Sequence, residues 1–453
     1  METLQQDLIN KPVKKLFFHF FFPAVFGMLL MSVNMLLDGI FVGHGVGEIG
    51  LAGVNLAAPI FTLILAISLW IGIGGATNFS NYVGEGSLEK ARSSFTLALA
   101  IFTGLLGIIS VVGYLNIETV ATWIGANEET LAPTTEYLRI LFSFGWILGL
   151  QEILSIFIRN DGRPVLGMVS LGVTSIVNVI LNYIFIFKLG LGVYGAGLAT
   201  VIGGAVGVAI FIPHFFKKQI VLNRMAWAWS KQLATRILSI GFPSLLAESG
   251  GFILIVGYNL SVAATLGTDG VTAFSVINYL HGFLFLAFFG IETAMQPMIS
   301  YYHGAKKKLE MQETIALAEK TAVGLGLTLF VIGFVFAPWL VRLFGVNDAS
   351  IIELAVEGIR LFFISYLFIG ISFVYMTYFQ SVGKVWSATV IILCRSYAFF
   401  LVYLFVLPKI LGVNGIWLSM PIAELTVAIL IVFIVRKRVR KQLKVTQVHS
   451  SSH

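Results

Sequence analysis

The chain contains near its amino terminus the sequence LFFHFFFPAVFGMLLMSVNMLLDG, at residues 16–39. Residues 16–37 include no Asp, Glu, Lys or Arg, and a run of about 20 apolar residues is long enough to span the hydrocarbon core of a bilayer. Every backbone polar group in lipid needs a hydrogen-bond partner inside its own segment, so such a run is a helix. The segment therefore predicts a transmembrane helix.

This run ends at a carboxylate, Asp38. A charged side chain near bilayer depth costs about 2.5–3.5 kcal/mol, and charges at such positions usually have a function. Asn34 lies four residues earlier, which places both side chains on one helix face. We expect Asn34 to share whatever Asp38 binds, and Asp38 to be the residue on which the function depends.

The composition extends the membrane assignment to the whole chain of 453 residues, since 58% of them are hydrophobic and 11% are charged. Soluble domains have about 25% charged residues, and the strands of a membrane barrel would instead alternate over about ten residues. The sequence therefore predicts an all-α polytopic membrane protein. We expect twelve transmembrane helices, at roughly 15–42, 51–83, 94–115, 131–158, 164–188, 194–217, 236–265, 270–302, 313–340, 352–381, 385–408 and 413–437.

The formal net charge of +7 is explained by topology. When the loops alternate between the two sides, 22 of the 29 Lys and Arg fall on one side, and only Lys188, Arg342 and Lys409 fall clearly on the other. The positive-inside rule then predicts that both termini and the central loop are cytoplasmic, in a plasma or bacterial inner membrane. The basic run from Arg436 to Lys441 is explained as stop-transfer charge after the last span, so we expect no nucleic-acid partner.

An internal repeat at an offset of 220 to 221 residues indicates the architecture. Five motif pairs are in register: Phe22-Pro23 with Phe242-Pro243, Tyr82-Val83-Gly84 with Tyr302-His303-Gly304, Gly125-Ala126-Asn127-Glu128 with Gly345-Val346-Asn347-Asp348, Leu138-Arg139 with Ile359-Arg360, and Gly192-Val193-Tyr194-Gly195 with Gly412-Val413-Asn414-Gly415. Six spans in each half make the repeats parallel, which predicts two six-helix bundles related by a pseudo-two-fold axis along the membrane normal. We expect an N-lobe at 1–220, a cytoplasmic linker at 221–235 and a C-lobe at 236–453, with the polar, Trp-containing stretch 217–231 as the hinge.

The fifth span, like the first, contains polar side chains within an apolar run. Thr174, Asn178 and Asn182 are spaced by four and share one helix face. Such a face either hydrogen-bonds neighbouring helices or lines a cation site. Beside a carboxylate, amide and hydroxyl oxygens suit a hard cation such as Na⁺, and the same surroundings would tune a protonatable Asp38.

Other acids also lie within predicted spans, namely Glu152, Glu248, Glu292 and Glu424. An acidic interior suits protons, metal cations or organic cations. Arg395 is the deeply placed base, on the span next to that of Glu424, and we expect these two to form a structural ion pair.

The second half has its own candidate residues. The repeat places Tyr258 or Asn259 opposite Asp38, so the halves are not chemically equivalent. Glu248 follows Pro243 by five residues and is the secondary carboxylate candidate. Gln296 precedes Pro297, which we expect to break the eighth helix and to leave the Gln296 amide available.

No G-x-x-x-x-G-K-[ST] sequence, metal-ligand spacing or catalytic triad spacing occurs in the chain. We therefore expect a monomeric transporter rather than an enzyme. No metal is expected beyond a possible Na⁺ at Asp38, and no cofactor apart from a coupling ion.

Several motifs together carry a family resemblance. They are Phe22-Pro23 before Asp38-Gly39, Pro59 with Gly72-Ile73-Gly74-Gly75, Tyr82-Val83-Gly84-Glu85-Gly86, the stretch from Asn178 to Tyr183, the stretch from Gly192 to Thr200, Gly241-Phe242-Pro243, and the stretch from Gln296 to Tyr301. This pattern resembles the multidrug and toxic compound extrusion (MATE) family over nearly the whole chain.

The resemblance implies two six-helix lobes around a central cleft that opens alternately to each side of the membrane. It implies an antiporter that exports amphipathic, cationic organic compounds in exchange for H⁺ or Na⁺, with a cation site made of Asp38, Asn178, Asn182 and Thr200. Acidic members of the family have Asp where this chain has Asn182, and often Tyr where it has Asn34, so both coupling ions stay open. Some relatives have a carboxylate at the position of Gly251, and Glu248 is the nearest acid here.

Two other functions are compatible with the sequence. Related two-lobe folds include flippases for lipid-linked precursors, and such a substrate would need a more cationic cleft than Arg395 alone supplies. The other alternative is a channel or a non-transporting receptor.

Overall fold

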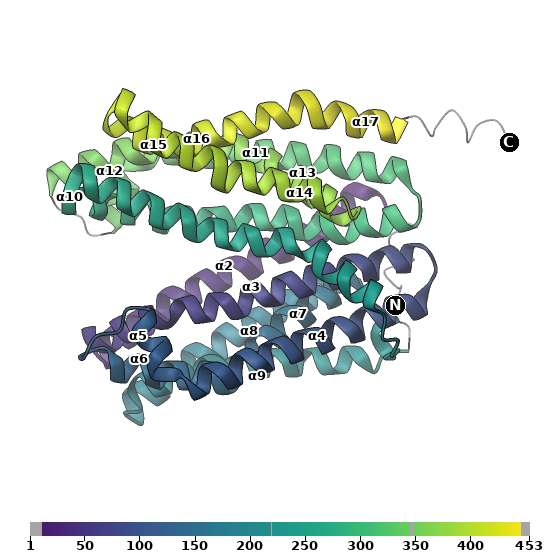
Figure 1. The fold of residues 1–453 in the computed structure, drawn as a ribbon, viewed down its shortest axis with the longest axis horizontal. Helices are drawn as coiled ribbons and strands as arrows, with labels where there is room; N and C mark the ends of the chain where they lie inside the picture. Colours follow the sequence, from purple (N-terminus) through teal and green to yellow (C-terminus); the bar gives the residue numbers. More distant parts are fainter. Residues whose placement is uncertain (1–10, 219, 345–347, 445–453) are drawn as a thin grey trace. The chain divides into compact units, whose positions relative to one another are not determined.

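The structure is a computed structural model that describes residues 11–218, 220–344 and 348–444. In these ranges all regular secondary structure is helical (Figure 1). One predicted repeat motif, Gly345-Val346-Asn347, lies outside the described residues.

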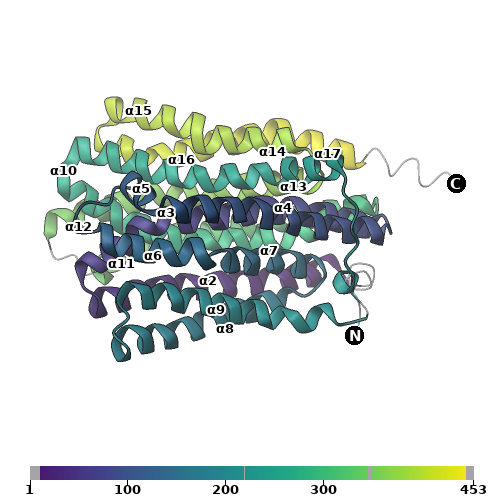
Figure 2. The same ribbon diagram turned by 60° about the horizontal axis from the view of Figure 1, so that its bottom comes forward.

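The helices of the first half are long, and they run side by side in both ribbon views (Figures 1 and 2). They are α2 (Val13–Gly45), α3 (Glu48–Gly84), α4 (Leu88–Leu115), α5 (Ile117–Trp123), α6 (Leu131–Phe144), α7 (Trp146–Asn160), α8 (Pro164–Asn182), the π-helical turn η1 (Tyr183–Lys188), α9 (Gly192–Phe215) and the 3₁₀ turn η2 (Val221–Asn223). Helix α3 packs on α4, α6 and α7, and α8 packs on α9.

The second half repeats this plan. Its elements are α10 (Lys231–Gly304), α11 (Lys308–Leu343), α12 (Ala349–Phe362), the 3₁₀ turn η3 (Phe363–Ser365), α13 (Tyr366–Ser381), α14 (Val385–Ile392), the π-helical turn η4 (Leu393–Ala398), α15 (Phe399–Leu411), α16 (Val413–Leu430), the π-helical turn η5 (Ile431–Arg436) and α17 (Lys437–Lys444). Helix α11 packs on α13, and α15 packs on α16.

Ten helical segments are long and apolar enough to cross a membrane, and the bent pair α6–α7 makes an eleventh. One of the ten, α10, contains a non-helical residue, Gly267, with φ 61° and ψ −146°. Glycine adopts this positive φ without a Cβ clash, and here it reverses the chain between two helices. The described residues thus contain the twelve predicted spans, and the protein is an all-α, multi-pass membrane protein.

Three features of the spans differ from expectation. The fourth span is bent by 49° at Gly145, between α6 and α7. The fifth, eleventh and twelfth spans each include a π-helical turn. The prediction of a helix broken at Pro297 is wrong, because α10 continues to Gly304. A proline removes one backbone donor, and a helix buried among other helices tolerates that loss.

The chain divides by its internal contacts into two compact units. One contains Phe22–Leu245, and the other contains Pro12–Phe21 together with the described residues from Leu246 onward. The chain therefore changes unit inside two helices, α2 and α10, next to the repeated Phe22-Pro23 and Phe242-Pro243 motifs. The predicted lobe limits at 220 and 236 stay a prediction.

Aromatic side chains fill the interior of the first unit. Phe157 of α7 is fully buried, and its ring lies 4.9 Å from that of Phe95 on α4 and 5.8 Å from that of Phe79 on α3. Lipid is as apolar as these side chains, so close packing rather than the hydrophobic effect holds such helices together.

Glycines allow a close crossing between α3 and the first turns of α10. A Cβ at Gly241 would collide with the backbone oxygen of Trp70, and one at Gly74 with that of Ile237. The Trp70 indole also donates to the Leu238 carbonyl over 2.7 Å. This crossing ties the start of α10 to the first unit.

We expect Gly241→Ala to destabilise the protein by about 1–3 kcal/mol, the usual cost of overpacking, since backbone atoms of α3 must move. Gly251→Ala is the matched control on the same helix, because no atom lies within 4 Å of a Cβ there. Thermal unfolding in detergent measures both variants. Equal midpoints for the two would contradict the close crossing.

Candidate functional site

Helix α2 presents the first two polar residues of the site. Asn34 and Asp38 are one helical turn apart and half-buried, and the Asn34 Nδ2 lies 3.4 Å from Asp38 Oδ2. Residues 34 and 38 face the same neighbour because positions i and i+4 share a helix face. The predicted pair is thus directed at one point.

Helix α8 supplies two buried amides to the same point. Asn182 Nδ2 donates to Asp38 Oδ1 over 2.5 Å and also lies 3.1 Å from Asn178 Oδ1. Asn178 and Asn182 are at most 1% exposed. Asn182 is the last residue of α8 before the π-helical turn η1, and π-bulges often occur at functional sites.

Helix α9 completes the predicted set with Thr200. Asn178 Nδ2 donates to Thr200 Oγ1 over 3.2 Å, and that hydroxyl donates to the Ala196 carbonyl over 3.1 Å. The structure therefore connects Asn34, Asp38, Asn182, Asn178 and Thr200 in one chain of hydrogen bonds, which we call the Asp38 network.

Sequence reasoning missed a member of this site, Tyr137 on α6. It is 8% exposed, and its hydroxyl hydrogen-bonds Thr200 and interacts electrostatically with Asp38. No spacing within α6 points to Asp38, since the proximity arises only when α6 and α9 pack together. A polar group inside an apolar span was the one available signal.

The polar residues of α8 form two separate groups of hydrogen bonds along the helix. One to two turns closer to the start of α8 than the Asp38 network, Thr174 and Ser170 accept hydrogen bonds from buried Gln151 of α7 over 2.8 and 3.1 Å. Both also donate to backbone carbonyls of α9, at Gly203 and Gly207. The predicted helix-contact role therefore applies to Thr174, and the ion-site role of Asn178 and Asn182 stays a prediction.

The Asp38 network also has acceptor oxygens that could hold a cation. Asn34 Oδ1 and Asn182 Oδ1 are buried and have no hydrogen-bond partner among the described residues. They belong to the two amides that contact Asp38. A single carboxylate with neutral oxygens matches one proton or one monovalent cation, and hard cations prefer oxygen ligands. No group of three or more His, Cys, Asp or Glu suited to a metal occurs within the residues searched, 11–218, 220–344 and 348–444.

Apolar residues close the network on the side of η1. Val42 of α2, Ile186 of η1 and Ala196 of α9 form a buried cluster, with Phe41 and Val46 packed against it. A polar group beside such a cluster has few waters to bond, which strengthens its interactions with the remaining polar partners.

The second-half candidates occupy separate parts of α10. Glu248 and Asn259 are half-buried, and Gln296 is buried with its Nε2 3.5 Å from Ser300 Oγ. Tyr258, which with Asn259 is one of the two residues that the repeat places opposite Asp38, is fully buried, and its hydroxyl oxygen accepts a hydrogen bond from the Met420 backbone N–H over 3.1 Å. The functional roles of Glu248, Asn259 and Gln296 stay predictions.

Arg395 and Glu424 lie together inside the second unit. Arg395 Nε donates to Glu424 Oε1 over 2.6 Å, and Ser372 Oγ donates to the other oxygen over 3.1 Å. The guanidinium also lies 4.8 Å from the centre of the Phe373 ring. The side chains of Arg395 and Glu424 are 7% and 0% exposed, so both charges are compensated within the protein.

A second ion pair, between buried Glu319 and half-buried Arg436, is not among the sequence-based expectations. Glu319 of α11 accepts from Arg436 over 2.7 Å and from the Tyr375 hydroxyl over 2.8 Å. These contacts join α11, α13 and the end of the last span. No local spacing indicates this pair, because Arg436 lies 117 positions after Glu319 in the chain.

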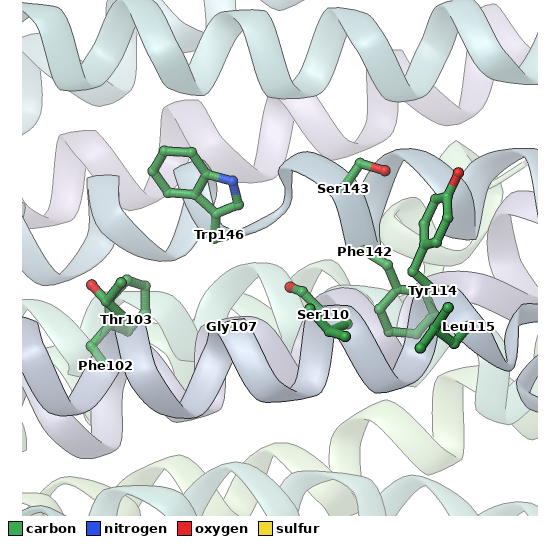
Figure 3. A pocket seen from close by; sticks show the side chains of 10 residues that line it. Phe102, Thr103, Gly107, Ser110, Tyr114, Leu115, Phe142, Ser143 and Trp146 are labelled. Carbon is green, nitrogen blue, oxygen red and sulfur yellow. The ribbon is translucent and has the colours of Figure 1, made fainter.

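The first unit also has a surface cavity of about 560 Å³, shown in Figure 3. Its lining comes from α4 and from the α6–α7 bend, with the hydroxyls of Thr103, Ser110 and Ser143 among apolar side chains. None of the predicted site residues lines it. Val111 and Leu115, two of its lining residues, are 60% and 75% exposed, and the cavity is separate from the Asp38 network.

Comparisons with known proteins agree with the repeat. The model of a family described as MatE matches the chain twice, at residues 23–184 and at residues 244–406. The starts of the two matches are separated by 221 residues, which confirms the offset of the repeat.

Similar proteins match nearly the full chain. The chain is 29% identical over 428 residues to the multidrug export protein MepA of Staphylococcus saprophyticus subsp. saprophyticus, with 93% of each chain covered. It is 28% identical over 437 residues to the protein of the same name from Staphylococcus aureus, with 95% of each covered.

Solved structures share the fold. One, described as the outward-facing conformation of a multidrug resistance MATE family transporter, superposes with a TM-score of 0.89 at 23% identity, over 97% of this chain and 98% of that one. A variant of the Vibrio cholerae MATE transporter VcmN gives a TM-score of 0.87 at 24% identity, over 95% and 97%.

Proposed function

Since the chain belongs to the MatE family, we propose that it is a secondary active antiporter that exports amphipathic organic cations in exchange for H⁺ or Na⁺. Its similarity to multidrug export proteins over 93% of the chain supports several chemically different substrates. The work is transport rather than covalent chemistry, and the protein acts as a monomer in the cell membrane with both termini cytoplasmic.

The observation that carries this proposal is the placement of Asp38. Its carboxylate lies inside a membrane-spanning unit, bonded by two amides and next to two buried amide oxygens without partners among the described residues. A proton or Na⁺ at Asp38 would cancel its charge and change which hydrogen bonds Asn34 and Asn182 make. An ion that binds one conformation better than another shifts the population toward it.

Exchange follows from competition between charges of the same sign. A coupling ion at Asp38 favours the conformation that has released an organic cation, and the export substrate favours the ion-free one. Each ligand shifts the equilibrium only by its differential affinity for the two states, which in coupled sites is typically about 1–3 kcal/mol.

The test is export of an ethidium-like dye from vesicles containing the purified protein. We expect saturable export driven by an imposed pH gradient or an imposed Na⁺ gradient, and the gradient that works identifies the ion. Dye flux that does not saturate would indicate a channel. Movement of a lipid-linked precursor in place of the dye would indicate a flippase.

A further inference from the structure

The connection between α9 and α10 is bound to the first unit at its start. Asp161, in the turn after α7, accepts a hydrogen bond from the Val221 backbone N–H over 3.2 Å, and Arg92 of α4 donates to the Val221 carbonyl over 3.0 Å. Ile220 and Leu222 on either side are buried. Residues 220–223 are therefore docked on the ends of α4 and α7 and are not a free hinge.

The carboxylate that holds this turn is itself well supported. The second oxygen of Asp161 lies 2.9 Å from His214 Nε2, at the end of α9, and both side chains are at most 4% exposed. Asp161 thus joins the α7–α8 turn, the end of α9 and the linker. In Figure 2 the linker is the teal connection at the right-hand end of the helices.

Beyond this turn the linker displays large apolar side chains. Met225, Trp227 and Trp229 are 67%, 68% and 69% exposed, and residues 225–230 are in no helix. Arg224, which leads into them, has the extended backbone angles φ −137° and ψ 139°. Met225, Trp227 and Trp229 occupy alternate positions, and in an extended chain alternate side chains point the same way.

The same end of the first unit is basic. Its charged residues lie at the end of α3, the start of α4, the α7–α8 turn and the α9–α10 linker: the basic ones are Lys90, Arg92, Arg159, Arg163, Lys217, Lys218, Arg224 and Lys231, and the acidic ones are Glu85, Glu89 and Asp161. Basic residues at a membrane surface attract anionic lipids, by about 1 kcal/mol per Lys or Arg. Tryptophan is enriched at the boundary between headgroups and acyl chains.

We propose that residues 224–231, the interfacial segment, bind the surface of an anionic phospholipid bilayer. Met225, Trp227 and Trp229 enter the boundary between headgroups and acyl chains, and Arg224 and Lys231 contact lipid phosphates. The docked turn at Val221 sets the height of the segment, because it fixes one end to the unit while Lys231 begins α10 at the other. The start of the second half is thereby held at the membrane surface.

Site-directed spin labelling tests this proposal, because Cys394 is the single cysteine of the chain. In a Cys394→Ser background, one cysteine is placed at Trp227, Trp229, Ala226 or Ala228 and labelled with a nitroxide. The full-length protein is then reconstituted in vesicles of phosphatidylcholine and phosphatidylglycerol, with no ion gradient. We expect labels at 227 and 229 to collide more with membrane-soluble oxygen than with a water-soluble nickel complex, and labels at 226 and 228 to do the reverse.

The charge part of the proposal has its own variant, Arg224→Gln with Lys231→Gln. We expect about a fivefold loss of phosphatidylglycerol preference for each charge removed, measured as quenching of a fluorophore at residue 227 by nitroxide-labelled phosphatidylglycerol relative to labelled phosphatidylcholine. Labels at 227 and 229 should keep their depth in the bilayer in this variant, and that result would show that the segment still adopts its native position.

Three results would overturn the proposal. Equal accessibility at all four positions would show that the segment has no apolar face directed at lipid. A label at 227 that is as open to the nickel complex as one at 228 would show that it faces water or a soluble partner. No preference for phosphatidylglycerol in the unsubstituted segment would refute anionic lipid as the ligand. None of these measurements requires transport, so they are independent of the proposed antiport.

Discussion

Asp38→Asn is expected to abolish ion-driven dye export, reducing its rate to that of vesicles without protein. Asparagine keeps the shape of the side chain, and its oxygen can still accept from Asn182, which lies 2.5 Å away in the native site. It cannot take up a proton or carry the charge that binds Na⁺.

A binding assay separates coupling from folding in this variant. We expect the Asp38→Asn protein to bind dye in detergent in a way that no longer depends on pH or Na⁺. The matched control is Asp269→Asn, which removes an exposed carboxylate at the turn within α10 and should export at the native rate. Native export by Asp38→Asn under both gradients would refute the assigned role.

The largest loss of stability is expected when one member of the Arg395–Glu424 pair is removed. Arg395→Met leaves the Glu424 carboxylate buried with the Ser372 hydroxyl as its remaining partner in the contacts described above. Breaking a buried pair in this way costs about 3–5 kcal/mol, whereas replacing both charges by apolar groups is often neutral.

The test is a double-mutant cycle in detergent. The single variants Arg395→Met and Glu424→Met should each unfold well below the native protein. The combined variant, with Ser372→Ala so that the hydroxyl does not lose its acceptor, should recover most of the difference. If the combined variant is as unstable as the sum of the single ones, the pair does not act as a unit and Arg395 has further partners that matter more.

The fold could be predicted from the sequence because a bilayer imposes a strong constraint on each span. Uncharged runs set the helices to within a few residues, as in the fifth span, predicted at 164–188 and found as Pro164–Lys188. The repeat was readable because equivalent motifs such as Phe22-Pro23 and Phe242-Pro243 stand at one offset. The bend at Gly145 could not be predicted from the sequence, since its flanking residues are as apolar as those of a straight span.

The candidate site could be predicted from the sequence where its residues share one helix. Asn34 with Asp38, and Asn178 with Asn182, are each four residues apart, so their common direction follows from helix geometry. The prediction that Asp38 and the Asn178–Asn182 pair form one site came from the family resemblance. Tyr137 and Glu319 were missed because their partners lie on other helices, and which faces meet is decided by packing that no local spacing encodes.

The assignment of Pro12–Phe21 to the second unit has a consequence for biosynthesis. Leu16, Phe17 and Phe20 in this segment are at most 1% exposed, yet the chain from Leu246 onward with which it groups is translated more than two hundred residues later. The first helix is therefore made before the rest of the unit to which its start belongs. A ribosome-bound fragment that stops before Leu246 lacks the rest of the second unit, so we expect Pro12–Phe21 to reach its final packing only after the second half is made.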